Sequence, residues 1–86
     1  MILEIYAIHD IASESYSQPF YAYNDAIATR TVGNAVKQPG TSFHDNPEDF
    51  RLYHIGSYDD NLGLIQPTNQ RFVIRLSDLA SLYETE

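Results

Sequence analysis

The sequence contains no cysteine and no tryptophan, and only five of its 86 residues are lysine or arginine. Without cysteine, neither a disulfide framework nor a zinc site built on thiolate ligands is possible. The twelve acidic residues outnumber the basic ones and give a formal net charge of −7. A field of that sign repels phosphate and disfavours non-specific binding of nucleic acid, which only a local cluster of basic side chains would reverse.

Long apolar stretches are also missing. No run approaches the roughly 20 apolar residues that a membrane-spanning helix needs. The opening residues, MILEIYAI, have neither the basic start nor the length of a signal peptide. We therefore expect a soluble, cytoplasmic protein that has no membrane partner.

The residues that are abundant are apolar and aromatic. A hydrophobic content of 43% and an aromatic content of 13% are typical of a folded chain rather than a disordered one. We predict a single domain spanning residues 1–86. A chain of this size builds a hydrophobic core of only marginal stability, which makes a homodimer a reasonable expectation.

Hydrophobic alternation predicts several strands. Residues 2–9, ILEIYAIH, are apolar on both faces, as in a central strand covered on both sides. Residues 19–23 predict a short strand that follows a loop, and residues 50–58 with 64–67 predict a hairpin around the turn DDNLG. In residues 71–76 we expect one apolar face, which points into the core, and an opposite face that carries both arginines. The apolar set is Phe72, Ile74 and Leu76, and the other set is Arg71, Val73 and Arg75.

Residues 25–37 predict an amphipathic helix, with Asn24 as its N-cap and Pro39-Gly40 as its stop. Ser77 is expected to cap a short C-terminal helix that carries Leu79, Leu82 and Tyr83. The fold class is therefore α+β: an antiparallel sheet of four to five strands, one main amphipathic helix packed on a face, and a short C-terminal helix. One main helix covers a single face, so either the C-terminal helix or a second copy of the chain should cover the other.

The segment HDNPEDF, residues 44–50, gathers acids, a histidine and an asparagine. Asn46 before Pro47, with Glu48 and Asp49 behind, is a helix-start pattern. A metal site would use His44, Asp45 and Glu48, but these match no established ligand spacing. The structural interpretation is favoured, and we expect neither a metal nor a cofactor.

Catalytic patterns are weak. His9 with Asp10 could meet His54 across the sheet as an acid/base pair, although nothing in their spacing requires it. Asp59, Asn61 and Gly63 resemble a calcium loop that lacks its later glutamate, and a hairpin turn explains them better. There is no glycine-rich phosphate loop and no nucleophile in a recognisable context, so we do not expect an enzyme.

The few basic residues suggest a possible surface for single-stranded nucleic acid. Arg30 and Lys37 share one edge of the helix, and tyrosines such as Tyr58 lie on predicted strands. The alternative is that the arginines pair with the surplus acids and the tyrosines fill the edges of the core. The candidate nucleic-acid-binding residues are Arg71, Arg75, Arg30, Lys37, Arg51, Tyr53 and Tyr21.

The order of the segments YAIHD, YSQPFYAY, a helix, HDNPEDF and LYHIGSYDD resembles the small nonstructural protein of gokushoviruses, single-stranded DNA bacteriophages of the Microviridae. The resemblance spans residues 3–62 and is most specific at PEDF and IGSYDD. The segment after Pro67 has no counterpart in it, and no DNA-contacting residue is carried over.

The resemblance implies a viral accessory protein that binds single-stranded DNA in the host cytoplasm. Proteins of that kind assist the switch from duplex replication to single-strand synthesis and packaging. A dimer that concentrates the few basic side chains on one face would reconcile this role with the acidic charge. The alternative is a protein–protein interaction module that binds a viral replication or capsid protein.

Overall fold

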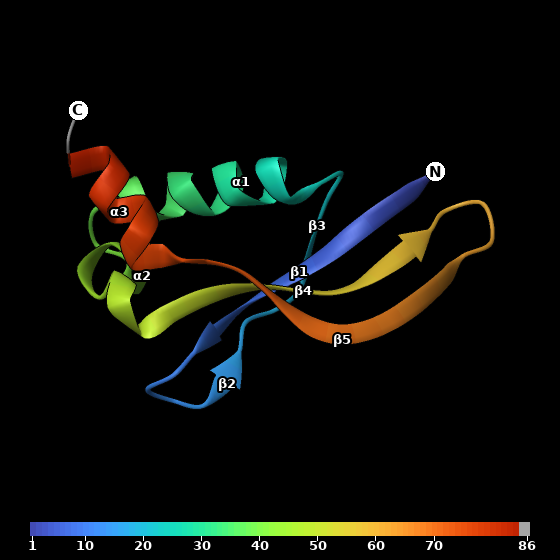
Figure 1. The fold of residues 1–86 in the computed structure, drawn as a ribbon, viewed down its shortest axis with the longest axis horizontal. Coiled ribbons are helices and arrows are strands. Elements are labelled where there is room, and N and C mark those ends of the chain that lie inside the picture. The colour runs from blue at the N-terminus through green and yellow to red at the C-terminus, as the bar shows by residue number, and fades with distance from the viewer. Residues whose placement is uncertain (85–86) are drawn as a thin grey trace.

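The structure of the chain, a computed structural model, describes residues 1–84 and the side chains of residues 1–82. A five-stranded antiparallel sheet carries helices on one side, which confirms the predicted α+β class (Figure 1). The elements are β1 (Ile2–Asp10), β2 (Ser15–Tyr16), β3 (Phe20–Ala22), α1 (Asp25–Lys37), α2 (Ser42–Asp45), the 3-10 turn η1 (Pro47–Asp49), β4 (Phe50–Asp59), β5 (Leu64–Arg75) and α3 (Leu76–Glu84).

Strand β1 lies at the centre of the sheet, whose order is β2-β1-β4-β5. The short strands β2 and β3 both pair with the outer edge of β1, β2 at its C-terminal end and β3 near its middle. β2 lies within the segment predicted as a loop, and β5 is one strand where the sequence suggested two. The β4–β5 hairpin extends beyond the helices, at the end of the molecule away from α3 (Figure 1).

Helix α1 begins and ends where the sequence predicts. The side chain of Asn24 accepts a hydrogen bond of 2.9 Å from the Ile27 backbone N–H, as an N-cap does. Both α1 and α3 pack on the same face of the sheet. The buried core between them consists of Tyr6, Ile8, Ala22, Ala28, Val32, Val36, Phe50, Leu52, Leu76 and Leu79.

A β-bulge in β5 breaks the expected alternation of side chains. Leu52 lies opposite Ile74, and its neighbour Tyr53 lies opposite Phe72, so Val73 is an extra residue in β5. Residues directly opposite each other share a face, so Ile74 points toward the helices while Phe72 points away from them. Phe72 is 49% exposed. The prediction that Phe72 points into the core is therefore wrong.

Two residues that the sequence predicts as helix caps, Asn46 and Ser77, do not cap a helix with their side chains. Asn46 precedes η1, but its side chain makes no capping hydrogen bond, and the short helix α2 is capped instead by Thr41. Ser77 lies inside α3, which begins one residue earlier, at Leu76. Of the residues expected on this helix, Leu79 is buried, Leu82 is 61% exposed, and the side chain of Tyr83 lies outside the described residues.

The hairpin turn has the chemistry that the sequence predicts. The side chain of Asp59 accepts hydrogen bonds from the backbone N–H groups of Asn61 and Leu62. Gly63 adopts a φ of +66°, a conformation that favours glycine. Farther along the hairpin, Gly56 lies against β5, and a Cβ atom there would be 2.7 Å from the carbonyl oxygen of Gln66.

Replacing Gly56 by alanine should therefore destabilise the hairpin. The added Cβ atom would collide with a backbone atom of β5, which cannot move aside as a flexible side chain can. We expect a loss of about 1–3 kcal/mol in the free energy of unfolding, the range for overpacked sites. Urea denaturation measures it. Ser57→Ala at the neighbouring position is the control and should change little. Equal stabilities for the two variants would contradict the close approach.

Candidate functional site

One face of the sheet carries no helix among the described residues. We call it the open face. Its side chains are Leu3, Ile5, Ala7 and His9 of β1, Tyr16 of β2, Tyr21 of β3, Arg51, Tyr53 and Tyr58 of β4, and Ile65, Phe72 and Arg75 of β5. The C-terminal helix packs with α1 on the opposite face, which excludes the first of the two expected covers for the second face of β1 and leaves a second copy of the chain as a prediction.

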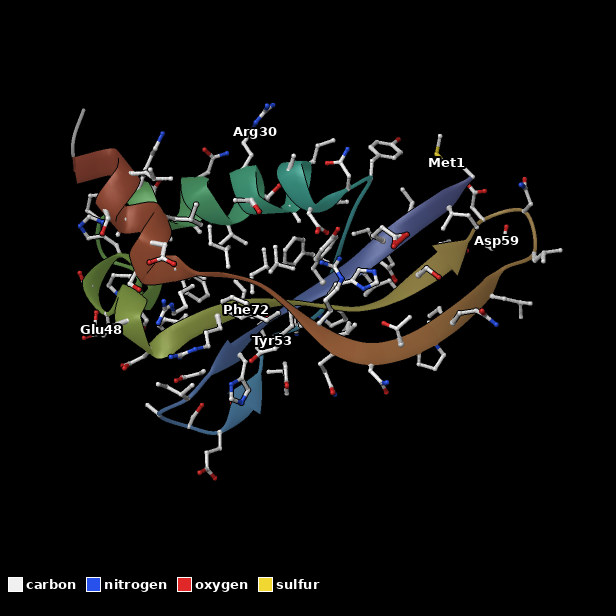
Figure 2. The ribbon with its side chains drawn as sticks, viewed as in Figure 1. Met1, Arg30, Glu48, Tyr53, Asp59 and Phe72 are labelled. Carbon is white, nitrogen blue, oxygen red and sulfur yellow. The ribbon has the colours of Figure 1, made fainter. Side chains whose placement is uncertain are left out.

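Four rings meet on the open face and form what we call the aromatic cluster: Tyr16, His9, Tyr53 and Phe72. Tyr53 is central, with ring centroids 6.0 Å from Tyr16, 6.0 Å from Phe72 and 6.2 Å from His9. Tyr53 and Phe72 lie together at the middle of the sheet (Figure 2). Tyr16 and Phe72 are 47% and 49% exposed, so two rings of the cluster are open to a ligand.

Two arginines lie next to the aromatic cluster. Arg51 of β4 is directly opposite Arg75 of β5, and on its other side it faces His9 of β1. Like charges directly opposite on a sheet destabilise it. Arg75 has one exposed partner, Asp78, at 3.7 Å, and the Nη1 nitrogen of Arg51 is buried without a hydrogen-bond partner in the part of the chain that the structure describes. An anion bound between them would relieve the repulsion.

Arg71 lies on the other face of the sheet. It is opposite His54, whose side chain packs beneath the helices against Tyr6. The guanidinium of Arg71 donates two hydrogen bonds, of 2.9 and 3.0 Å, to the carboxylate of Asp25 at the start of α1. Arg71 and Arg75 therefore do not share a face. The bulge at Val73, between the two arginines, explains why simple alternation fails here.

The carboxylate of Asp25 joins α1 to two strands. The hydroxyl of Tyr6 donates a hydrogen bond of 2.6 Å to it, in addition to the two from Arg71. These bonds, the one from Arg71 first, hold the pKa of Asp25 below its usual range. Burial of Tyr6, followed by its hydrogen bond to Asp25, raises the pKa of that phenol. The network is a structural tether, since it connects elements and lines neither of the surface hollows described below.

The remaining candidates lie elsewhere. Arg30 is on α1 and points away from the strands, on the side opposite the open face (Figure 2). Lys37 is exposed at the last turn of the same helix. Tyr21 is on the open face but contacts Tyr58, at 6.0 Å, nearer the hairpin end. Of the seven predicted residues, the structure brings together Arg51, Tyr53 and Arg75.

Sequence reasoning missed three members of the aromatic cluster. Tyr16 lay in a presumed loop, Phe72 was assigned to the core, and His9 was weighed only with His54 as an acid/base pair. That pair does not form, because His9 is on the open face while His54 contacts Glu4 at 2.8 Å beneath the helices. The alternation of β1 alone would have placed His9 on the same face as Ala7.

The surface hollows lie apart from the aromatic cluster. The larger, of about 530 Å³, is lined by residues that include Lys37, His44 and Glu48, between α1, η1 and α3. The smaller, of about 300 Å³, is at the hairpin end. Among the described residues, no group of three or more histidine and acidic side chains is placed to hold a metal ion, and no helix is long and apolar enough to cross a membrane.

A protein-family model described as Phage ORF5 protein matches residues 3–79. The chain belongs to the Phage ORF5 family. No curated protein and no solved structure matches it. Membership in the Phage ORF5 family identifies a bacteriophage protein. The match runs through β5 into α3, so it includes most of the segment after Pro67 for which the gokushovirus resemblance had no counterpart.

The tether around Asp25 predicts that the stability of the protein depends on pH. Asp25→Ala removes the acceptor of the buried Tyr6 hydroxyl, and should lower the free energy of unfolding at pH 7 by about 1–3 kcal/mol. Because the pKa of Asp25 is lowered by folding, its contribution is complete above about pH 4 and is lost as the pH falls through the folded-state value.

Denaturation at pH 7 and pH 3 measures this difference, which should shrink at the lower pH. Asp45→Asn, an exposed acid at the end of α2, is the control. A difference between Asp25→Ala and the parent that is the same at both pH values would contradict an ionised Asp25 as the tether.

Proposed function

We propose that this phage protein binds single-stranded DNA on the open face of its sheet. It acts as a nonstructural accessory protein of a single-stranded DNA phage of the gokushovirus type, in the host cytoplasm. Its role is to assist the switch from duplex replication to single-strand synthesis and packaging. The observation that carries the proposal is the pairing of Arg51 with Arg75 beside the aromatic cluster.

The chemistry of the open face suits an exposed nucleic-acid strand. Aromatic side chains stack on bases of any sequence, at about 1–3 kcal/mol per base, while arginine binds the phosphates between them. On this face Tyr53 and Phe72 supply rings and the adjacent row supplies Arg51 and Arg75. Bases paired inside a duplex do not present their flat faces to such a surface, which favours a single strand.

The net charge of −7 need not oppose this binding. Asp59 and Asp60 lie at the hairpin turn, at the far end of β4 from Arg51. Interactions between exposed charges weaken beyond about 8–10 Å at physiological ionic strength. A local pair of arginines can therefore attract phosphate although the molecule as a whole is acidic.

Arg75→Ala should weaken binding of a labelled single-stranded oligonucleotide. The loss of one phosphate contact reduces the slope of log affinity against log salt by about 0.7 for a single strand. Fluorescence anisotropy at several salt concentrations measures both quantities. Arg75 is exposed, so the variant should remain folded.

Arg30→Ala is the matched control, since it removes the same charge from the far side of α1 and should have little effect. Equal losses from the two arginines would indicate a general charge effect and contradict the site. If no oligonucleotide binds at low salt, the proposed function is wrong.

A second candidate function is protein binding, which the apolar hairpin end favours. Five large apolar side chains there are 51–68% exposed: Met1, Ile2, Leu62, Leu64 and Ile65. Residues 61–70 contain no charged side chain. Clustered exposed apolar residues mark interaction sites, and an uncharged stretch suits contact between two acidic copies. If the protein binds another protein, we propose that the partner is a second copy of this chain, or a viral replication or capsid protein.

A homodimer should therefore form through the hairpin end. Sedimentation equilibrium at micromolar concentration should give about twice the chain mass of 9.8 kDa. Leu62→Ser combined with Leu64→Ser should give the monomer mass without loss of fold, because both side chains are exposed. A parent protein that stays monomeric across this range contradicts the dimer.

A further inference from the structure

The rings of the aromatic cluster are not parallel. Tyr53 is inclined by 70° to Tyr16 and by 75° to Phe72, and His9 is inclined by 48° to Tyr16. Bases that remain stacked on one another are nearly parallel, with a rise of about 3.4 Å per nucleotide. Bases that lie on Tyr16 and Phe72 are held on either side of the inclined Tyr53 ring, whose centroid is 6.0 Å from each of theirs, so the two bases do not stack directly on each other.

The accessible rings lie on opposite sides of the cluster. Tyr16 belongs to β2 at one edge of the sheet and Phe72 to β5 at the other, while the partly buried Tyr53 separates them. A strand that used both rings would cross β1 and β4. The row next to Tyr53 and Phe72 on the same face holds Arg51 and Arg75, within reach of the phosphates of such a strand.

We infer, on the basis of the proposed function, that the ligand of this surface is a short, unstacked and pyrimidine-rich segment of single strand. It spans about two or three bases, the number that aromatic side chains on other nucleic-acid-binding sheets stack. Adenine-rich strands stack on themselves more strongly and must be unstacked before they bind. Pyrimidine preference in single-strand binding arises from this difference in stacking and from backbone flexibility.

Separate anisotropy titrations of fluorescently labelled oligonucleotides test the inference with the intact chain. The three probes are oligo(dT) of eight nucleotides, oligo(dA) of the same length, and a DNA hairpin with a GC-rich stem as the duplex. We expect oligo(dT) to bind about three- to tenfold more tightly than oligo(dA), and the duplex to bind more weakly than either strand. Phe72→Ala should weaken oligo(dT) binding by about tenfold.

Tyr23→Ala is the control, because Tyr23 is an exposed ring in the connection between β3 and α1 and should not matter. The inference is wrong if oligo(dT) and oligo(dA) bind with equal affinity, or if the duplex binds more tightly than either. Either result is still compatible with DNA binding on the open face. Absence of binding to all three probes at low salt overturns both.

Discussion

Packing of α1 and α3 on a single face of the sheet determines which side chains are buried beneath helices and which lie on the open face. Tyr6 and Ile8 of β1 and Leu52 of β4 lie fully or nearly buried beneath these helices. Alternation then directs Ala7 and Tyr53 to the opposite side. That side is apolar at the centre of β1, carries aromatic rings from neighbouring strands, and has no helix on it within residues 1–84. An aromatic surface is thus a direct consequence of one-sided helix packing.

Bulges in β5 decide which arginines belong to that surface. The extra residue Val73 reverses the directions of both Phe72 and Arg71, which leaves Arg71 beside α1, where Asp25 neutralises it. Arg75 instead faces Arg51 across the strands. The same sequence segment therefore contributes one arginine to stability and another to the open face. Arg51 and Arg75 lie directly opposite each other, and the partner that Arg75 has is the exposed Asp78, which is the reason to propose a ligand-binding role for the two arginines.

The sequence predicts the helix α1 and the hairpin turn correctly because each follows a regular sequence pattern. The α1 boundaries followed from Asn24 and the helical period, and the hairpin turn followed from Asp59 and Gly63. The position of Phe72 was not predictable, because a bulge depends on packing between strands and leaves no trace in the alternation of residues 71–76. Tyr16 was missed because a two-residue strand has no period. Arg51, Tyr53 and Arg75 were named as candidates, but only the register shows that they are neighbours.

The central claim is that the open face, and not the helix face, meets the ligand. Backbone amide chemical shifts of isotope-labelled protein, recorded by NMR during titration with oligo(dT), test it most directly. The account predicts that the largest changes fall on His9, Tyr16, Arg51, Tyr53, Phe72 and Arg75, with little change along α1. Changes concentrated at Arg30 and its neighbours on α1, with the open face unaffected, would contradict it.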